Sequence, residues 1–161
     1  MGHSYVNLGN VYDITNKLGL AIENYEKAIK IFRQQEDYKS LSFALNNLGS
    51  FYIDSKQFKK AKVYLDEALN LREKLGDMKG VCSTNIILGK LYTMQNNPDY
   101  KKAEESLKYA LLLNKDIGLE INKKDIYFEL SDLYKRQKKW IAHFIITIYI
   151  LKFYKMNIKP I

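Results

Sequence analysis

Residues 8–28 read LGNVYDITNKLGLAIENYEKA, and the pattern within them recurs along the chain. A Leu-Gly pair is followed by a Tyr and then by two Ala residues that lie seven positions apart. The same positions return forty residues later as Leu48-Gly49, Tyr52, Ala61 and Ala68. A third copy has Leu88-Gly89, Tyr92, Ala103 and Ala110, and a fourth begins at Leu130-Ser131 and Tyr134. Such a period indicates an array of repeated structural units.

Each copy is predicted to form two helices joined by a short turn. In the first helix, Leu and Tyr lie four residues apart and so share one face. The Gly beside the Leu has no side chain, so a neighbouring helix can approach closely there. In the second helix, the two Ala residues lie on one stripe and allow the same approach. A lone helix pair cannot bury such faces whereas stacked pairs can, so we predict an all-α fold of about four antiparallel helix pairs.

The array is predicted to be a single domain over residues 1–161. Its repeats are expected at about 4–41, 42–81, 82–122 and 123–156, with a tail at 157–161. The helices are expected at 4–15, 18–35, 39–54, 58–75, 78–95, 98–115, 122–137 and 140–156. Pro98 suits the first turn of its helix, with Asn97 as the cap. Gly76 and Gly118 are expected to end second helices.

The recurring residues resemble the tetratricopeptide repeat, whose pattern is W-x2-L-G-x2-Y … A-x3-F … A. The Trp positions are occupied by Tyr5, Leu45, Asn85 and Tyr127, and the Phe positions by Tyr25, Leu65 and Leu107. The period of 40–42 residues exceeds the usual value of about 34. This longer form is similar to kinesin-light-chain and Leu-Gly-Asn arrays and to those of bacterial sensors and regulators. The resemblance implies a right-handed superhelical solenoid.

The resemblance also implies a concave groove, lined by first helices, that holds an extended peptide or a partner protein. The candidate groove residues are Asn7, Asn10, Asn46, Asn47, Ser50, Lys90, Phe128 and Asp132. Asn suits this role because its amide both donates and accepts, as a peptide group does. The alternative is that these Asn side chains cap or brace neighbouring helices. The family's carboxylate clamp is matched only in part, by Asn10 and Lys90, so we do not predict it.

Composition excludes several other classes of protein. The 161 residues hold 26 basic and 18 acidic side chains, and residues 133–161 hold seven basic and no acidic ones. Only three of the basic residues are Arg, the residue on which base readout relies, so nucleic acid is an unlikely partner. One Cys and two His argue against a metal centre, and we expect no cofactor. Cys82 and His143 are expected to be packing residues.

The last predicted helix departs from the repeat. Residues 140–154, WIAHFIITIYILKFY, are apolar on every side, which is typical of a buried or membrane helix. A helix over residues 140–154 is about 22 Å long, whereas a helix of the roughly 20 apolar residues that a membrane span needs is about 30 Å long. A membrane is therefore an unlikely partner. We expect self-association as a homodimer, or docking of a further segment, through Trp140, Phe144, Ile148 and Leu151. The alternative is a poorly ordered tail.

These observations predict a non-enzymatic module that binds a protein or peptide. No phosphate-binding loop, H-E-x-x-H or C-x-x-C motif occurs, so no catalytic site is expected. One alternative is the sensor portion of a bacterial signalling protein, with its output domain elsewhere. A second is binding of nucleic acid or an anionic surface by the basic C-terminal end. With no signal peptide at residues 1–20, we expect a cytoplasmic protein, although a single Cys also suits the periplasm.

Overall fold

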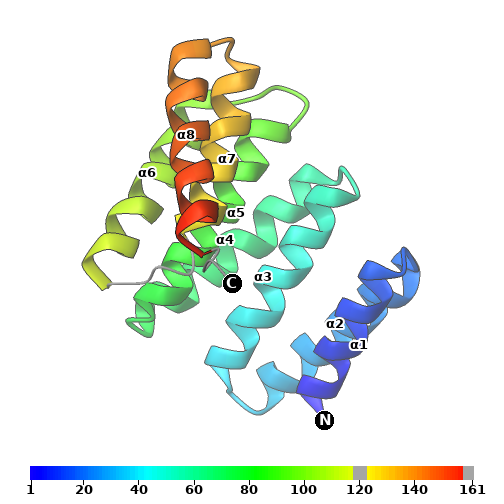
Figure 1. Cartoon of the computed structure of the whole chain (residues 1–161). Coiled ribbons are helices and arrows are strands. Elements are labelled where there is room, and N and C mark those ends of the chain that lie inside the picture. Colours follow the sequence, from blue (N-terminus) through cyan, green and yellow to red (C-terminus); the bar gives the residue numbers. More distant parts are fainter. Residues whose placement is uncertain (118–122, 158–161) are drawn as a thin grey trace. The chain divides into compact units, whose positions relative to one another are not determined.

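The computed structural model describes residues 1–117 and 123–157, and every element in these ranges is a helix. The helices are α1 (Gly2–Ile14), α2 (Leu18–Gln34), α3 (Tyr38–Asp54), α4 (Phe58–Lys74), α5 (Met78–Met94), α6 (Tyr100–Ile117), α7 (Lys123–Arg136) and α8 (Trp140–Asn157) (Figure 1). They form four helix pairs, so the all-α prediction is confirmed. The predicted helices match them to within three residues at each end.

The chain divides into two compact units. The N-terminal unit, Met1–Thr84, holds α1 to α4 and the start of α5. The C-terminal unit, Asn85–Ile161, holds the rest of α5 and α6 to α8. The single array with its repeat boundaries stays a prediction.

The core of the N-terminal unit lies around α3. This helix packs against α2 and α4 and also touches α1, so most of its residues are buried. The ring of Phe51 on α3 lies 6.4 Å from the ring of Tyr25 on α2, measured between centroids. In the C-terminal unit, α7 packs against both α6 and α8, and Ile126, Leu130 and Leu133 of α7 are buried. α3 and α7 are therefore the central helices of their units.

The two helices of a pair meet at the repeated Gly. A Cβ atom added at Gly49 would lie 2.6 Å from Cγ of Leu65, and one at Gly89 would lie 2.5 Å from Cγ of Leu107. Real Cβ atoms do not come this close to a neighbour, so any larger residue would push the helices apart. The repeated Ala residues of the second helices are fully buried. The packing roles predicted for these small residues are confirmed.

The turns between helices use one recurring backbone motif. A residue with positive φ follows the helix at Asn16, Glu36, Lys56, Gly76 and Lys138. At Lys56 the backbone N–H donates to the carbonyl of Ile53, and the N–H of Gln57 donates to that of Tyr52. This pair of bonds is the Schellman motif, which satisfies the last carbonyls of a helix. The predicted role of Gly76 is confirmed, whereas Gly118 lies outside the described residues.

The start of α6 differs from the prediction. The helix begins at Tyr100, so Pro98 precedes its first turn and Asn97 is not the cap. Instead Asp99 caps the helix, because its Oδ1 accepts a hydrogen bond of 3.1 Å from the backbone N–H of Lys102. Asp37 caps α3 in the same way through the N–H of Ser40, at 3.0 Å. These bonds lower the pKa of both carboxyls, since they favour the charged form.

The left-handed turn residues generate a stability prediction. Lys56 occupies a conformation that costs an L-residue about 1–2 kcal/mol, which Gly avoids at an entropic cost of about 0.5–1 kcal/mol. We therefore expect Lys56→Gly to raise the free energy of unfolding by about 0.5–1 kcal/mol. Urea denaturation followed by circular dichroism measures this change. In the control Lys30→Gly, on an exposed position of α2, the same substitution should cost about 1 kcal/mol. Destabilisation by both would contradict the prediction.

Candidate functional site

An accessible stripe runs along the first helices of the N-terminal unit. On α1 it consists of His3, Asn7, Asn10 and Ile14, and on α3 the residues forty positions later are Phe43, Asn47, Ser50 and Asp54. All eight are exposed or half-buried, because the buried faces of α1 and α3 point toward second helices. Four of the predicted groove residues therefore share this stripe, which we call the α1–α3 stripe.

Two Asn side chains join the α1–α3 stripe into one surface. Oδ1 of Asn10 accepts a hydrogen bond of 3.3 Å from Nδ2 of Asn47 on the neighbouring helix. The same oxygen accepts a second bond of 2.7 Å from the hydroxyl of Tyr25 on α2. Tyr25 is itself buried, with its ring against the backbone of Gly9, so its hydroxyl is held in a fixed place.

This network holds both amides in place. Burial raises the pKa of Tyr25, and the nearby carboxylate of Asp13 raises it further, so the phenol keeps its proton. In the structure this phenol donates to the amide oxygen of Asn10, and the same oxygen accepts from the amide nitrogen of Asn47. Nδ2 of Asn10 and Oδ1 of Asn47 then have no hydrogen-bond partner among the described residues. The pair offers one donor and one acceptor.

Asn46 lies outside the α1–α3 stripe. It is 5 % exposed, and its Oδ1 accepts a hydrogen bond of 3.1 Å from Nη1 of Arg72 on α4. The same nitrogen donates to the carbonyl of Gly80, at 2.8 Å, and to the hydroxyl of Thr84, at 2.6 Å. Asn46 thus braces three successive helices, which is the alternative that the sequence left open for the Asn residues.

Arg72 is a buried charge that the sequence analysis missed. Burial lowers its pKa, and the carboxylate of Asp77 opposes this effect. Gly80 is small enough to leave room for it, since an added Cβ would lie 2.7 Å from Cδ of Arg72. The signal was present in the register of the repeat: Arg72 occupies the buried stripe position that Phe32 holds forty residues earlier. A polar residue on an otherwise apolar stripe indicates a buried network.

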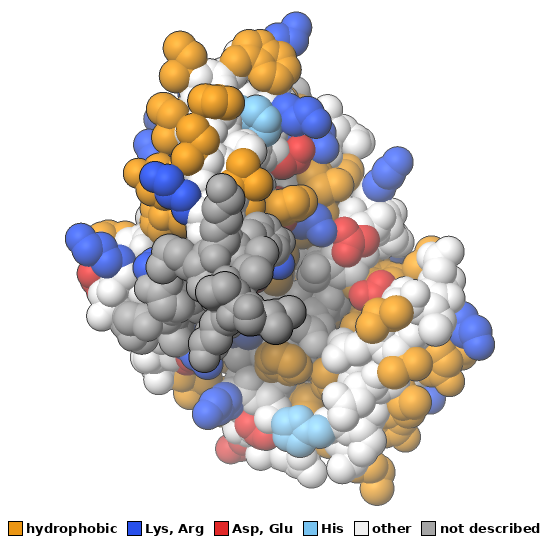
Figure 2. All heavy atoms as spheres, viewed as in Figure 1, with side chains coloured by type: hydrophobic (Ala, Val, Ile, Leu, Met, Phe, Trp, Pro, Cys, Tyr) orange, Lys and Arg blue, Asp and Glu red, His pale blue; other side chains and the backbone are white. Residues whose placement is uncertain are grey.

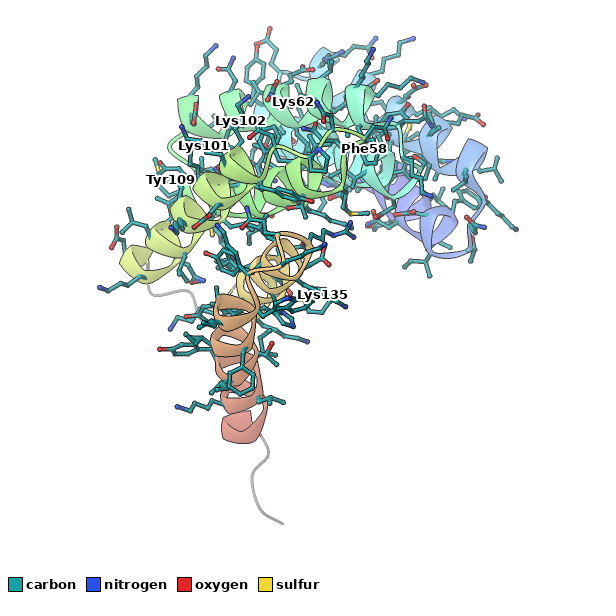
Figure 3. All side chains as sticks on the ribbon, turned by 90° about the horizontal axis from the view of Figure 1, so that it is seen from above. Phe58, Lys62, Lys101, Lys102, Tyr109 and Lys135 are labelled. Carbon is teal, nitrogen blue, oxygen red and sulfur yellow. The ribbon has the colours of Figure 1, made fainter. Side chains whose placement is uncertain are left out.

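The remaining predicted groove residues belong to the C-terminal unit. Lys90 is half-buried on α5, and Phe128 is exposed on α7. Asp132 accepts a hydrogen bond of 2.6 Å from Nε of Arg136 one turn later, so its charge is partly engaged. Lys139 lies 3.7 Å from a carboxylate oxygen of Glu104, whereas Lys135 is exposed on α7 (Figure 3). Two charges of the basic C-terminal end are therefore paired within the fold.

The residues predicted for self-association lie on α8. Trp140, Phe144, Ile148 and Leu151 are all exposed, and Figure 2 shows hydrophobic side chains gathered along this helix. The opposite side of α8 packs on α7, where Tyr149 stacks on Tyr127. Nδ1 of His143 lies 3.0 Å from both the hydroxyl and the carbonyl oxygen of Ser131. His143 therefore connects α8 to α7. Cys82, the other residue expected to have a packing role, is fully buried in α5.

Among the described residues, no three His, Cys, Asp or Glu side chains come together as a metal site would need. Within the same part of the chain, none of the helices combines the length and the apolar character that crossing a membrane requires.

Comparison with known proteins identifies the repeat. The sequence model of the tetratricopeptide repeat matches residues 2–35 and 44–75. Residues 2–35 and 44–75 therefore match two tetratricopeptide repeats, as the sequence predicted. Tetratricopeptide repeats are generally non-catalytic and typically bind proteins.

Two relatives extend this result. One is the regulatory protein RapG of Bacillus subtilis (strain 168), which is 30 % identical over 74 residues. That match covers 45 % of this chain and 20 % of RapG. The other is the crystal structure of BtubC (BKLC) from P. vanneervenii, with a TM-score of 0.80 and 21 % identity. It covers 99 % of this chain and 66 % of BtubC, so the chain spans less than two thirds of either relative and shares the fold of the second.

The network around Arg72 generates a prediction that separates Asn46 from Asn47. Replacing Asn46 with Ala removes one of three hydrogen bonds from a buried cation, so we expect a loss of about 1.5–3 kcal/mol in the free energy of unfolding. Asn47→Ala is the matched control on a half-exposed neighbour, with an expected loss of about 0.5–1 kcal/mol. Denaturation of both variants measures the difference. An equal decrease in the free energy of unfolding in both variants would contradict the prediction, because the Asn46–Arg72 bond would then contribute no more than the bond of Asn47.

Proposed function

We propose that the chain is a non-enzymatic interaction module that binds an extended peptide segment of a partner protein on the α1–α3 stripe. The observation that carries the proposal is the Asn10–Asn47 pair, which the hydroxyl of Tyr25 orients. The family's general role in protein binding supports the same reading.

The chemistry of the Asn pair matches one peptide group. Nδ2 of Asn10 can donate to a peptide carbonyl, while Oδ1 of Asn47 can accept from a peptide N–H. Both amides are already held by the Tyr25 network, so little side-chain entropy is lost when the peptide binds. Main-chain recognition of this kind gives affinity without strict sequence specificity.

Side chains beside the Asn pair would supply the specificity. Phe43 is half exposed on α3 and can anchor an apolar side chain of the ligand. Asn7 and Ser50 extend the polar line on either side of the pair. The C-terminal unit holds the other candidate groove residues on a surface of its own, where Phe128 is exposed and Lys90 and Asp132 are half-buried. Asn46 is not part of the proposed surface, because it is buried against Arg72.

A regulatory role is a second candidate. It is supported by the 30 % identity to RapG, whose printed description is a regulatory protein. In this reading the peptide bound by the repeats changes the state of an output domain in a longer protein. In that case, hydrogen exchange of the backbone amides would change in α8 when a peptide occupies the α1–α3 stripe. A change confined to α1 to α4 would instead favour a module that only binds the peptide.

A peptide selection tests the proposed function. A displayed library of random dodecapeptides is panned against the whole chain, and the affinity of the enriched peptides is measured by calorimetry. We expect Asn10→Ala and Asn47→Ala each to weaken binding by about 2- to 12-fold, since each removes one hydrogen bond. Asn70→Ala, on an exposed position of α4, is the control and should bind as the parent does. Failure to enrich any peptide, or equal affinity in all variants, would contradict the proposal.

A further inference from the structure

One face of α1 is uncovered where the equivalent face of α3 is buried. Leu8 is 43 % exposed and Val11 is 54 % exposed. Their equivalents forty residues later, Leu48 and Phe51, are 0 % and 1 % exposed. Leu8 and Leu48 hold equivalent repeat positions, and so do Val11 and Phe51. All four are apolar, so the difference in exposure comes from what packs against each helix.

The helix that covers α3 shows what would cover α1. Phe51 is buried because α2, the second helix of the preceding repeat, packs on α3 and places the ring of Tyr25 beside it. The same arrangement recurs in the C-terminal unit, where α6 packs on α7 and the hydroxyl of Tyr134 donates to Glu104 at 3.1 Å. The uncovered face of α1 therefore holds the repeat positions that a second helix covers on α3.

α8 is the second helix of its pair, and the positions with which a second helix contacts the following first helix are exposed and apolar in it. Glu104, which meets the following first helix from α6, corresponds to Phe144 on α8. The exposed Lys108 corresponds to Ile148, one turn later on the same stripe. Phe144 and Ile148 are 65 % and 37 % exposed, in a register where α6 is charged. Figure 2 shows the apolar surface that results along α8, and it also shows hydrophobic side chains along α1.

We propose that α8 of one copy packs on α1 of a second copy, as α2 packs on α3 within the chain. This contact does not depend on the peptide surface of the proposed function. It joins two different faces, so an open assembly always keeps one free α1 face and one free α8 face, and only a closed ring keeps none.

Charge favours this pairing over contact between two α8 helices. Lys138 and Lys139 precede α8 and Lys152 lies within it, while residues 133–161 contain no acidic side chain. Two α8 helices would bring like charges together, which opposes association. α1 contains no Lys or Arg, and its one carboxylate is Asp13. The apolar face of α1 is thus the better partner for a basic, apolar helix.

Two singly blocked variants test the proposal. Val11→Glu places a charge on the α1 face and Ile148→Glu places one on the α8 face. Both positions are exposed, so the variants should fold, which circular dichroism checks. Light scattering after size exclusion then gives the mass of the parent, of each variant and of their equimolar mixture over a concentration series. Val63→Glu, at an exposed apolar position of α4, is the matched control and should assemble as the parent does.

The expected pattern belongs to head-to-tail contact alone. The mass of the parent should rise with concentration, each variant by itself should stay a monomer, and the mixture should form a dimer and nothing larger. The mixture stops at two because the intact α8 of Val11→Glu meets the intact α1 of Ile148→Glu, and the other two faces are blocked. Leu8→Glu and Phe144→Glu should repeat the result if a first variant fails to fold.

Other outcomes overturn the proposal. A dimer of Val11→Glu by itself would mean that two α8 helices pair. A dimer of Ile148→Glu by itself would mean that two α1 helices pair. A parent that stays a monomer at every concentration, or a mixture that does, would show that the two faces do not bind each other.

Discussion

The contact between Tyr25 and Gly9 links the packing of the first repeat to its surface chemistry. The ring lies so close to the helix that a Cβ at residue 9 would be 2.7 Å from one of its carbons. Its other neighbour is Phe51 in the next helix, so one side chain connects α1, α2 and α3. The hydroxyl at its far end then reaches Asn10 and fixes the two amides of the stripe. A larger residue at position 9 would displace this ring and with it the oriented pair.

The repeat made most of the fold predictable. Leu, Gly, Tyr and Ala at fixed spacing are sufficient to place eight helices, because close approach at Gly and Ala is a local requirement that the sequence states directly. The start of α6 was missed, since Asp99 and Asn97 are both good caps and the lengthened turn before them hides the register. The positive φ at Glu36 and Lys56 was also missed, because in those turns the Schellman bonds hold residues that rarely adopt it.

The candidate site was predictable only in part. Asn46 and Asn47 are adjacent and identical, and the sequence gives no sign that one is buried on Arg72 while the other lies on the surface. That outcome depends on partners 26 residues later for Asn46 and 37 residues earlier for Asn47, which no local pattern contains. The register of the second helices did hold a usable signal, because Arg72 interrupts an apolar stripe. Comparing equivalent positions across repeats is the way to find such residues.

The same comparison locates the two uncovered faces. Leu8 and Val11 on α1 are exposed where their equivalents on α3 are buried under α2. Phe144 and Ile148 on α8 are apolar where the equivalent positions of α6 carry charge. The surface chemistry of the module thus has two sources: polar side chains along first helices and apolar faces on α1 and α8.

Replacement of Tyr25 with Phe tests most directly whether this side chain orients the Asn pair. The change keeps the ring against Gly9 and Phe51 and removes only the hydroxyl that donates to Asn10. The measurement is the affinity of a selected peptide, with helix content checked by circular dichroism. The account predicts an unchanged fold and binding about 2- to 12-fold weaker, the effect of one hydrogen bond. A folded variant that binds the peptide as tightly as the parent would contradict it.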